Sequence, residues 1–91
     1  MMNVLQKGEF KKAYKRLHEN QLDVVNEAIE TVMENPEIGE QKKGDLVKFR
    51  VYKFPVLDQL YLLGYVYDEA KNTLILHAFG PHQNFYRDLK K

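Results

Sequence analysis

The sequence predicts an α+β fold: an N-terminal helical hairpin packed on one face of a small antiparallel β-sheet, with a short C-terminal helix or tail. Apolar residues recur with a helical period before residue 35 and alternate with a period of two after residue 46. Asn-Pro and Gly-Pro pairs separate these stretches. Since 91 residues suffice for one modest core, we expect residues 1–91 to form a single domain.

The first helix is expected from about Gly8 to Glu19, because its apolar residues follow an i, i+3, i+4, i+7 spacing: Phe10, Ala13, Tyr14 and Leu17. A second helix carries a similar stripe, formed by Leu22, Val25, Ala28, Ile29 and Val32. Asn35-Pro36 ends that helix, since the residue before a proline is pushed out of the α region. The two helices form a hairpin that needs a sheet to cover its apolar side.

The stretch "LVKFRVYKF" changes to strand alternation, with Val47, Phe49 and Val51 as the expected core face. The opposite, open face then carries Lys48, Arg50 and Tyr52. Such a face suits RNA, because cations meet phosphates and aromatic rings stack on unpaired bases. Alternation alone also requires polar residues there, so the strand by itself favours an ordinary solvated face over an RNA-binding one.

Two further strands follow a turn marked by Pro55 and Asp58. The segment "QLYLLGYVY" is apolar on both sides and is therefore expected to be central. After a hairpin loop at 68–72, "TLILHAF" forms the next strand, which Gly80-Pro81 breaks. The tail 82–90 is a short helix or coil, and "NVLQ" at 3–6 could add an edge strand.

Composition excludes several kinds of site. The chain has no cysteine, no P-loop and no G-x-G-x-x-G motif, and its three histidines are far apart, so we expect no metal site and no cofactor. No apolar run approaches the ~18 residues of a membrane span, and the first residues do not resemble a secretory signal. A cytoplasmic location is therefore expected, without membrane association.

Charge is segregated although the net charge is only +1. Residues 21–45 hold seven acids against two lysines, whereas residues 1–20 and 46–91 are both basic. A polyanionic partner is compatible with the basic flanks, but so is an acidic helix beside ordinary basic surface.

The C-terminal "GPHQNFYRDLK" combines His82 with Tyr86, four residues later and on the same side of a helix. Histidine is the side chain whose ordinary pKa lies nearest neutrality, although a structural hydrogen-bonded pair is the commoner explanation. Phe85 is expected to anchor the tail in the core. His77 is interpreted as a partly buried structural residue in step with Phe79, and His18 as a surface residue.

Several strings of the chain resemble one known family: "FKKAYKRL", "ENPEIGEQKKGDL", "RVYKF", "YLLGYVYDE" and above all "GPHQNFYRDLK". They resemble the RelE/ParE superfamily of toxins from bacterial type II toxin–antitoxin systems, in its RelE/YafQ-like branch. The resemblance covers nearly the whole chain and implies a helical hairpin on a small antiparallel sheet. It also implies a metal-independent endoribonuclease, an mRNA interferase that cuts mRNA in the A site of the ribosome, inhibits translation and is neutralised by a cognate antitoxin.

The resemblance also implies site residues. Gly80, His82 and Tyr86 match the spacing of the family's catalytic histidine and neighbouring ring, and Arg50 would complete the catalytic set by stabilising phosphate charge. Further RNA contacts fall on five basic residues: Lys48, Lys53, Lys42, Lys43 and Arg87. The chain departs from RelE itself in two places, since Tyr61 and His82 stand where RelE has arginines. The match therefore favours a histidine-based version of the cleavage.

Two alternatives use the same fold, because a fold does not determine a function. One is a ParE-like inhibitor of DNA gyrase without catalysis, and the other is a degenerate member that binds an antitoxin but has lost activity. The presence of Arg50, His82 and Tyr86 counts against both.

Overall fold

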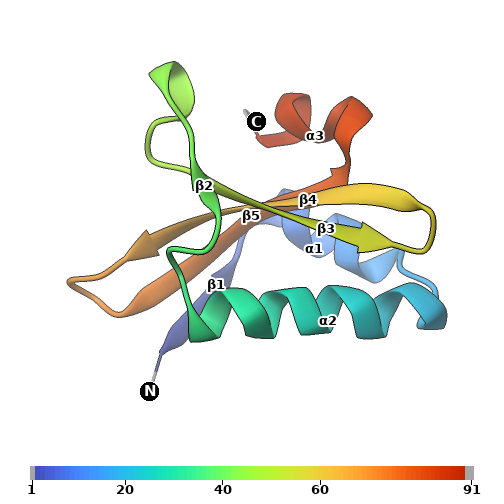
Figure 1. Cartoon of the computed structure of the whole chain (residues 1–91). Coiled ribbons are helices and arrows are strands. Elements are labelled where there is room, and N and C mark those ends of the chain that lie inside the picture. The colour runs from blue at the N-terminus through green and yellow to red at the C-terminus, as the bar shows by residue number, and fades with distance from the viewer. Residues whose placement is uncertain (1, 90–91) are drawn as a thin grey trace.

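The computed structural model describes residues 2–89, and side chains 84 and 88 are not described; the last predicted tail residue, 90, therefore lies outside. One five-stranded sheet, in the order β1-β5-β4-β3-β2, organises this part of the chain (Figure 1). Its strands are β1 (Asn3–Gln6), β2 (Glu40–Gln41), β3 (Arg50–Val56), β4 (Gln59–Asp68) and β5 (Thr73–Pro81). The helices are α1 (Gly8–Lys15), α2 (Glu19–Glu34), the 3-10 turn η1 (Gly44–Leu46) and α3 (His82–Leu89).

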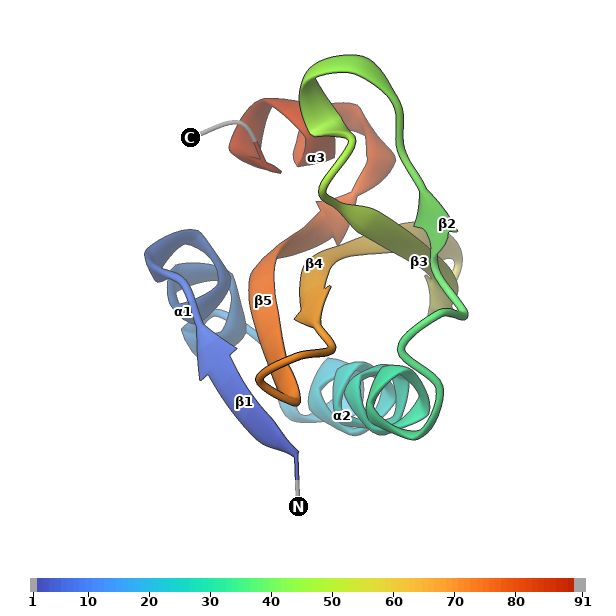
Figure 2. The ribbon, with the colours of Figure 1, turned by 90° about the vertical axis from the view of Figure 1, so that its left-hand side faces the viewer.

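The α1–α2 hairpin covers one side of the sheet, and α3 lies on the other side (Figure 2). Phe10 of α1 is fully buried, as are Val25 and Val32 of α2, so the predicted stripes do form the core. Helix α1 ends earlier than predicted, at Lys15. A short connection then leads to α2, where the Gln21 side chain accepts a hydrogen bond from the backbone N–H of His18. The predicted hairpin is thus confirmed with a shorter first helix.

Strand β4 is the middle strand, as its apolar character on both sides predicted. Leu63 and Tyr65 face the hairpin core, whereas Leu62 packs in the second core beneath α3. Both cores exclude water, because Leu62, Leu63 and Tyr65 are each at most 1 % exposed. Hydrophobic burial on both faces therefore fixes β4 between two layers of helix.

The prediction for the faces of the first long strand is wrong. Phe49 and Val51 pack beneath α3, while Tyr52 and Phe54 face the helical hairpin. Val47 is 55 % exposed because it follows the 3-10 turn η1 and precedes β3. The cause is that Phe54 and Val56 continue the apolar series begun at Tyr52, so the hairpin covers this side of β3, while on the α3 side Val51 is buried and Lys53 and Pro55 are exposed.

The sheet is mixed rather than purely antiparallel. The predicted edge strand β1 exists, but it pairs in parallel with β5. In the β4–β5 ladder, Gly64 pairs with Ala78 and Tyr65 with Leu76, so His77 is an extra residue in a β-bulge. The bulge reverses the alternation: Leu76 and Phe79 both face the hairpin core, and Ala78 faces α3. His77 contacts Phe49 on the α3 side, so the expectation that His77 is in step with Phe79 is wrong.

Two turns also differ from expectation. Pro55 lies within β3, and the connection to β4 is the two-residue turn Leu57-Asp58, in which Leu57 has φ 55°. Gly80 and Pro81 continue β5 instead of breaking it, since they still pair with β4. Consequently α3 starts directly from the end of the strand. Within residues 2–89, no helix is long and apolar enough to cross a membrane.

Candidate functional site

Helix α3 is held on the sheet by two side chains that point down onto β4. Phe85 is 1 % exposed and Leu89 is 3 % exposed, which confirms Phe85 as the anchor of the tail. They sit directly over Gly64, where a Cβ atom would lie 2.7 Å from Leu89 Cδ1 and 2.8 Å from Phe85 Cζ. Only the absence of a side chain at Gly64 allows this close approach. The packing fixes the rotation of α3 and hence the direction of its outer residues.

With α3 held in this rotation, the side chains of His82 and Tyr86 lie next to each other at the surface of the protein. Their ring centroids are 6.0 Å apart with an interplanar angle of 82°, an edge-on contact that follows from the i, i+4 spacing. His82 is exposed and Tyr86 half-buried, with the Tyr86 ring also edge-on to Phe85 at 5.1 Å. A titratable imidazole therefore stands in solvent beside a fixed aromatic ring.

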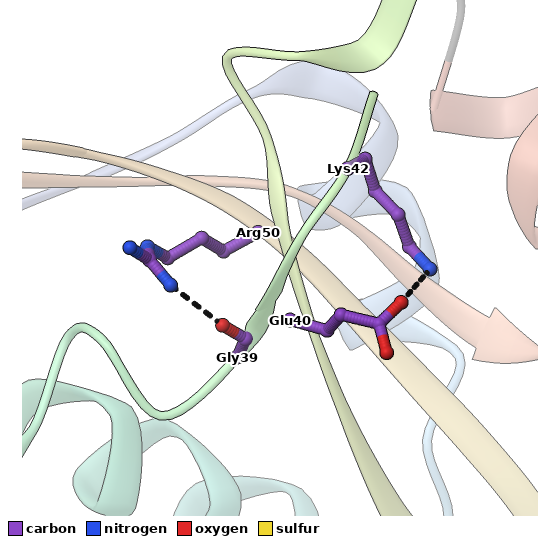
Figure 3. A network of polar contacts seen from close by, with 4 residues as sticks. All are labelled: Gly39, Glu40, Lys42 and Arg50. Atoms are coloured by element: carbon purple, nitrogen blue, oxygen red, sulfur yellow. Dashed lines mark hydrogen bonds and ion pairs between the residues drawn. The ribbon is translucent and has the colours of Figure 1, made fainter. Parts of the chain in front are cut away.

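The segment before β3 brings a lysine to the same place. Lys42 Nζ lies 5.6 Å from the centroid of the Tyr86 ring, within cation–π range. The same ammonium donates a hydrogen bond of 2.7 Å to Glu40 Oε1 (Figure 3). This bond and the Tyr86 hydroxyl raise the pKa of Lys42, while Lys42 lowers the pKa of the Glu40 carboxyl. Lys42 is thus the predicted RNA contact that the structure joins to the His82–Tyr86 pair.

Glu40 was not predicted as a site residue. Its carboxylate lowers the positive charge of the site. The predicted RNA contacts were basic residues only, so an acidic residue was not among them. A signal was present, because Glu40 and Lys42 are two residues apart in an extended segment and so point to the same side. The charges of Lys53 and, more weakly, Lys43 also lower the pKa of Glu40. The charges of three predicted RNA contacts therefore act on this carboxylate, and one of them, Lys42, is bonded to it.

Arg50 does not join this group. Its Nη1 donates a hydrogen bond of 2.9 Å to the carbonyl oxygen of Gly39 (Figure 3). The same nitrogen donates one of 3.2 Å to the carbonyl oxygen of Glu37. The prediction that Lys48, Arg50 and Tyr52 form one open face is wrong, since Tyr52 packs against the hairpin core. The guanidinium is instead committed to the loop before β2.

The remaining predicted residues lie elsewhere. Lys48 lies over the Phe49 ring at 5.3 Å, and its charge also reaches His77. Burial, followed by the charges of Lys7 and Lys48, lowers the pKa of His77. Arg87 is exposed on α3. Among residues 2–89, no group of three His, Cys, Asp or Glu side chains is placed to hold a metal ion.

The geometry can be compared with known proteins. Residues 4–90 match a family model described as the ParE-like toxin of type II bacterial toxin–antitoxin systems. A search of curated proteins found no match.

Solved structures of similar fold include two toxin–antitoxin complexes. The RelBE complex of E. coli has a chain with a TM-score of 0.71 and 17% identity, over 91% of this chain and 99% of that one. The RelBE2 complex of Mycobacterium tuberculosis gives 0.75 and 17%, over 89% and 98%. A conserved hypothetical protein of Helicobacter pylori is 26% identical at a TM-score of 0.55, over 90% and 96%. The chain belongs to the ParE-like toxins of type II bacterial toxin–antitoxin systems, within the RelE/ParE superfamily.

Proposed function

We propose that this toxin is an mRNA endoribonuclease that cuts mRNA in the A site of the ribosome without a metal ion. The observation that carries the proposal is the group formed by His82, Tyr86 and Lys42, which combines an imidazole, a half-buried aromatic ring and a cation. RNA cleavage uses acid–base groups and cations, and an aromatic ring can stack on an unpaired base. Two fold relatives are RelE chains from RelBE complexes, which agrees with this choice.

The reaction proceeds through the RNA's own 2′-hydroxyl. A base removes its proton, the 2′-oxygen attacks the adjacent phosphorus, and the bond from phosphorus to the 5′-oxygen breaks as an acid protonates that oxygen. His82 can serve as base or acid, because histidine's ordinary pKa of about 6.5 lies near the working pH. Tyr86 would stack on a base or donate a proton, and Lys42 with Lys53 would stabilise the extra phosphate charge.

A modest net charge is compatible with this role. At +1, the protein has little general attraction for free RNA. The ribosome would hold the mRNA and present it in a fixed conformation, which supplies much of the orientation that the toxin would otherwise have to provide. We therefore expect cleavage to depend on ribosomes, and the protein to act in the cytoplasm.

A cognate antitoxin is the proposed partner. Two of the fold relatives come from toxin–antitoxin complexes. Covering Lys42 and Lys53 would keep these cations from the RNA, whereas moving α3 would carry the His82–Tyr86 pair away from them. Co-expression with the cognate antitoxin should restore growth, and a complex structure that leaves both Lys42 and His82 exposed would contradict this mode of inhibition.

Single-turnover cleavage on programmed ribosomes tests the assignment of residues. His82→Ala should lower the rate at least 100-fold, the typical scale of general acid–base catalysis, and Lys42→Ala should lower it less. His18→Ala is a matched control, since His18 is an exposed histidine at the start of α2. Equal rates for His82→Ala and His18→Ala would remove His82 from the mechanism.

A second candidate is inhibition of DNA gyrase, which the ParE-like description of the family model favours. A gyrase supercoiling assay separates the two functions. Gyrase inhibition that persists in His82→Ala, together with intact mRNA, would establish this candidate in place of the ribonuclease.

A further inference from the structure

We propose that Arg50 and Tyr65 are positioning residues that clamp the 36–39 loop (residues Pro36 to Gly39) and so hold the Glu40–Lys42 pair against Tyr86. The catalytic consequence of this inference rests on the proposed ribonuclease function, whereas the positioning itself does not. Neither clamp residue needs to touch RNA. In this proposal Arg50 acts through the loop rather than by contact with the phosphate.

Tyr65 holds both ends of the 36–39 loop from inside the core. Its side chain is fully buried in central strand β4. The hydroxyl donates a hydrogen bond of 2.6 Å to the carbonyl oxygen of Pro36 and accepts one of 2.9 Å from the backbone N–H of Gly39. Burial raises the pKa of this phenol, so it remains a neutral donor throughout the physiological range. One buried hydroxyl thus satisfies two loop groups that would otherwise be unpaired.

Gly39 shows how closely the loop is pressed onto this ring. A Cβ atom at position 39 would lie 2.6 Å from the Tyr65 hydroxyl oxygen and 2.9 Å from Tyr65 Cε1. Any larger residue would displace either the ring or the loop. The loop is therefore seated on Tyr65 with no room between them.

Arg50 holds the same loop from its other side. The guanidinium bonds to the carbonyl oxygens of Glu37 and Gly39, so the backbone of Gly39 is held through its N–H by Tyr65 and through its C=O by Arg50. Both bonds come from one nitrogen, Nη1, whose two N–H groups are fixed in the guanidinium plane, whereas a lysine side chain is one atom shorter and its ammonium has no planar geometry. The two side chains together fix the peptide groups on both sides of residue 39.

The clamp determines the position of residues 40–42, because these residues have few other contacts that hold them. Glu40 follows Gly39 directly, and β2 contains only Glu40 and Gln41, paired with Val51 and Arg50. Lys42 adds one backbone hydrogen bond, from its N–H to the Phe49 carbonyl at 3.0 Å. A shift of the 36–39 loop would therefore rotate the strand that directs Glu40 and Lys42 toward Tyr86.

Two conservative variants test the clamp, each with a matched control. Tyr65→Phe removes only the buried hydroxyl, and Tyr67→Phe removes a hydroxyl from the same face of β4 that bonds to Asn72 in the exposed hairpin. Arg50→Lys keeps the charge but shortens the side chain by one atom and removes the Nη1 nitrogen that donates both bonds, and Arg16→Lys is an exposed counterpart at the end of α1. Circular dichroism checks that all four proteins are folded.

The first readout is the titration of Glu40 and Lys42, followed by NMR of the side-chain carbons. In Tyr65→Phe and Arg50→Lys, the pKa of Glu40 should rise toward 4.5 and that of Lys42 should fall toward 10.5, while both controls titrate like the wild type. A merely structural loss of stability would not move these two values in a folded protein. Unchanged values in both clamp variants would overturn the inference.

The second readout is single-turnover cleavage on ribosomes. Both clamp variants should lose about tenfold or more, since a misplacement of about 1 Å can cost on the order of 100-fold. Full activity in both, despite shifted pKa values, would overturn the catalytic consequence of the clamp. If the wild type cuts no mRNA while the pKa values shift as stated, the proposed function fails and the positioning of Glu40 and Lys42 stands.

Discussion

Replacing Gly64 with alanine should loosen α3 from the sheet, because the new methyl group has no space. Its carbon would lie 2.7 Å from Leu89 Cδ1 and 2.8 Å from Phe85 Cζ. Carbon atoms are ordinarily about 3.5–4.0 Å apart, so both buried side chains must move by about 1 Å. Overpacking of this kind costs about 1–3 kcal/mol, and alanine recovers up to about 1 kcal/mol of chain entropy relative to glycine. We expect a net loss of about 0.5–2 kcal/mol.

Urea unfolding of Gly64→Ala measures this loss as a lower free energy of unfolding. Gly8→Ala is the control, because a Cβ atom there meets no atom within 4 Å and the site should be neutral or slightly stabilising. Hydrogen exchange in the folded protein should show faster exchange of the α3 amides only in Gly64→Ala.

A double-mutant cycle makes the test specific for the contact with Leu89. Leu89→Ala opens space above Gly64, so the double variant should be more stable than the sum of the two single losses implies. Additive losses, or a Gly64→Ala protein as stable as Gly8→Ala, would refute the packing argument for α3.

Three further predictions concern single side chains. Burial lowers the pKa of His77 below 6.5, so the unfolded chain takes up a proton that the native protein resists; stability should fall as the pH drops below 6.5. His77→Gln should flatten this dependence in unfolding curves at pH 5.5 and 7.5, and equal slopes would contradict it. Tyr14→Phe removes the 2.7 Å bond from the Tyr14 hydroxyl to Asn26 Oδ1 between α1 and α2, and should cost about 0.5–1.5 kcal/mol in urea unfolding; an unchanged midpoint would contradict the value of that bond. Glu40→Gln should lower the pKa of Lys42, measured by NMR, and a value equal to that of the wild type would show that Glu40 is not its main partner.

Local periodicity was sufficient to predict the parts of the fold that one element determines by itself. The helical stripes of the hairpin and the two apolar sides of β4 each follow from neighbouring residues along the chain. The burial of Phe85 and the contact of His82 with Tyr86 likewise needed only the spacing within α3.

The errors arose where two segments distant in sequence decide the result. The alternation of residues in β3 does not predict which side of the strand the hairpin covers, because Val51 on one side and Phe54 on the other are both apolar and both buried. The bulge at His77 depends on the pairing with β4, and the parallel direction of β1 depends on the path of the chain.

The site shows the same division. The Arg50 guanidinium bonds to carbonyl oxygens 11 and 13 residues earlier in the chain, a contact between distant segments that periodicity does not predict. Glu40 enters the site only because the 36–39 loop carries it there.

The central claim is that the group formed by His82, Tyr86 and Lys42 is a ribonuclease site. Primer-extension mapping of an mRNA in a translating cell-free system tests it most directly, with wild type, His82→Ala and His18→Ala, each with and without ribosomes. The account predicts cuts that require ribosomes, persist in His18→Ala and vanish in His82→Ala. Intact mRNA with the wild-type protein, or the same cuts in His82→Ala, would contradict it.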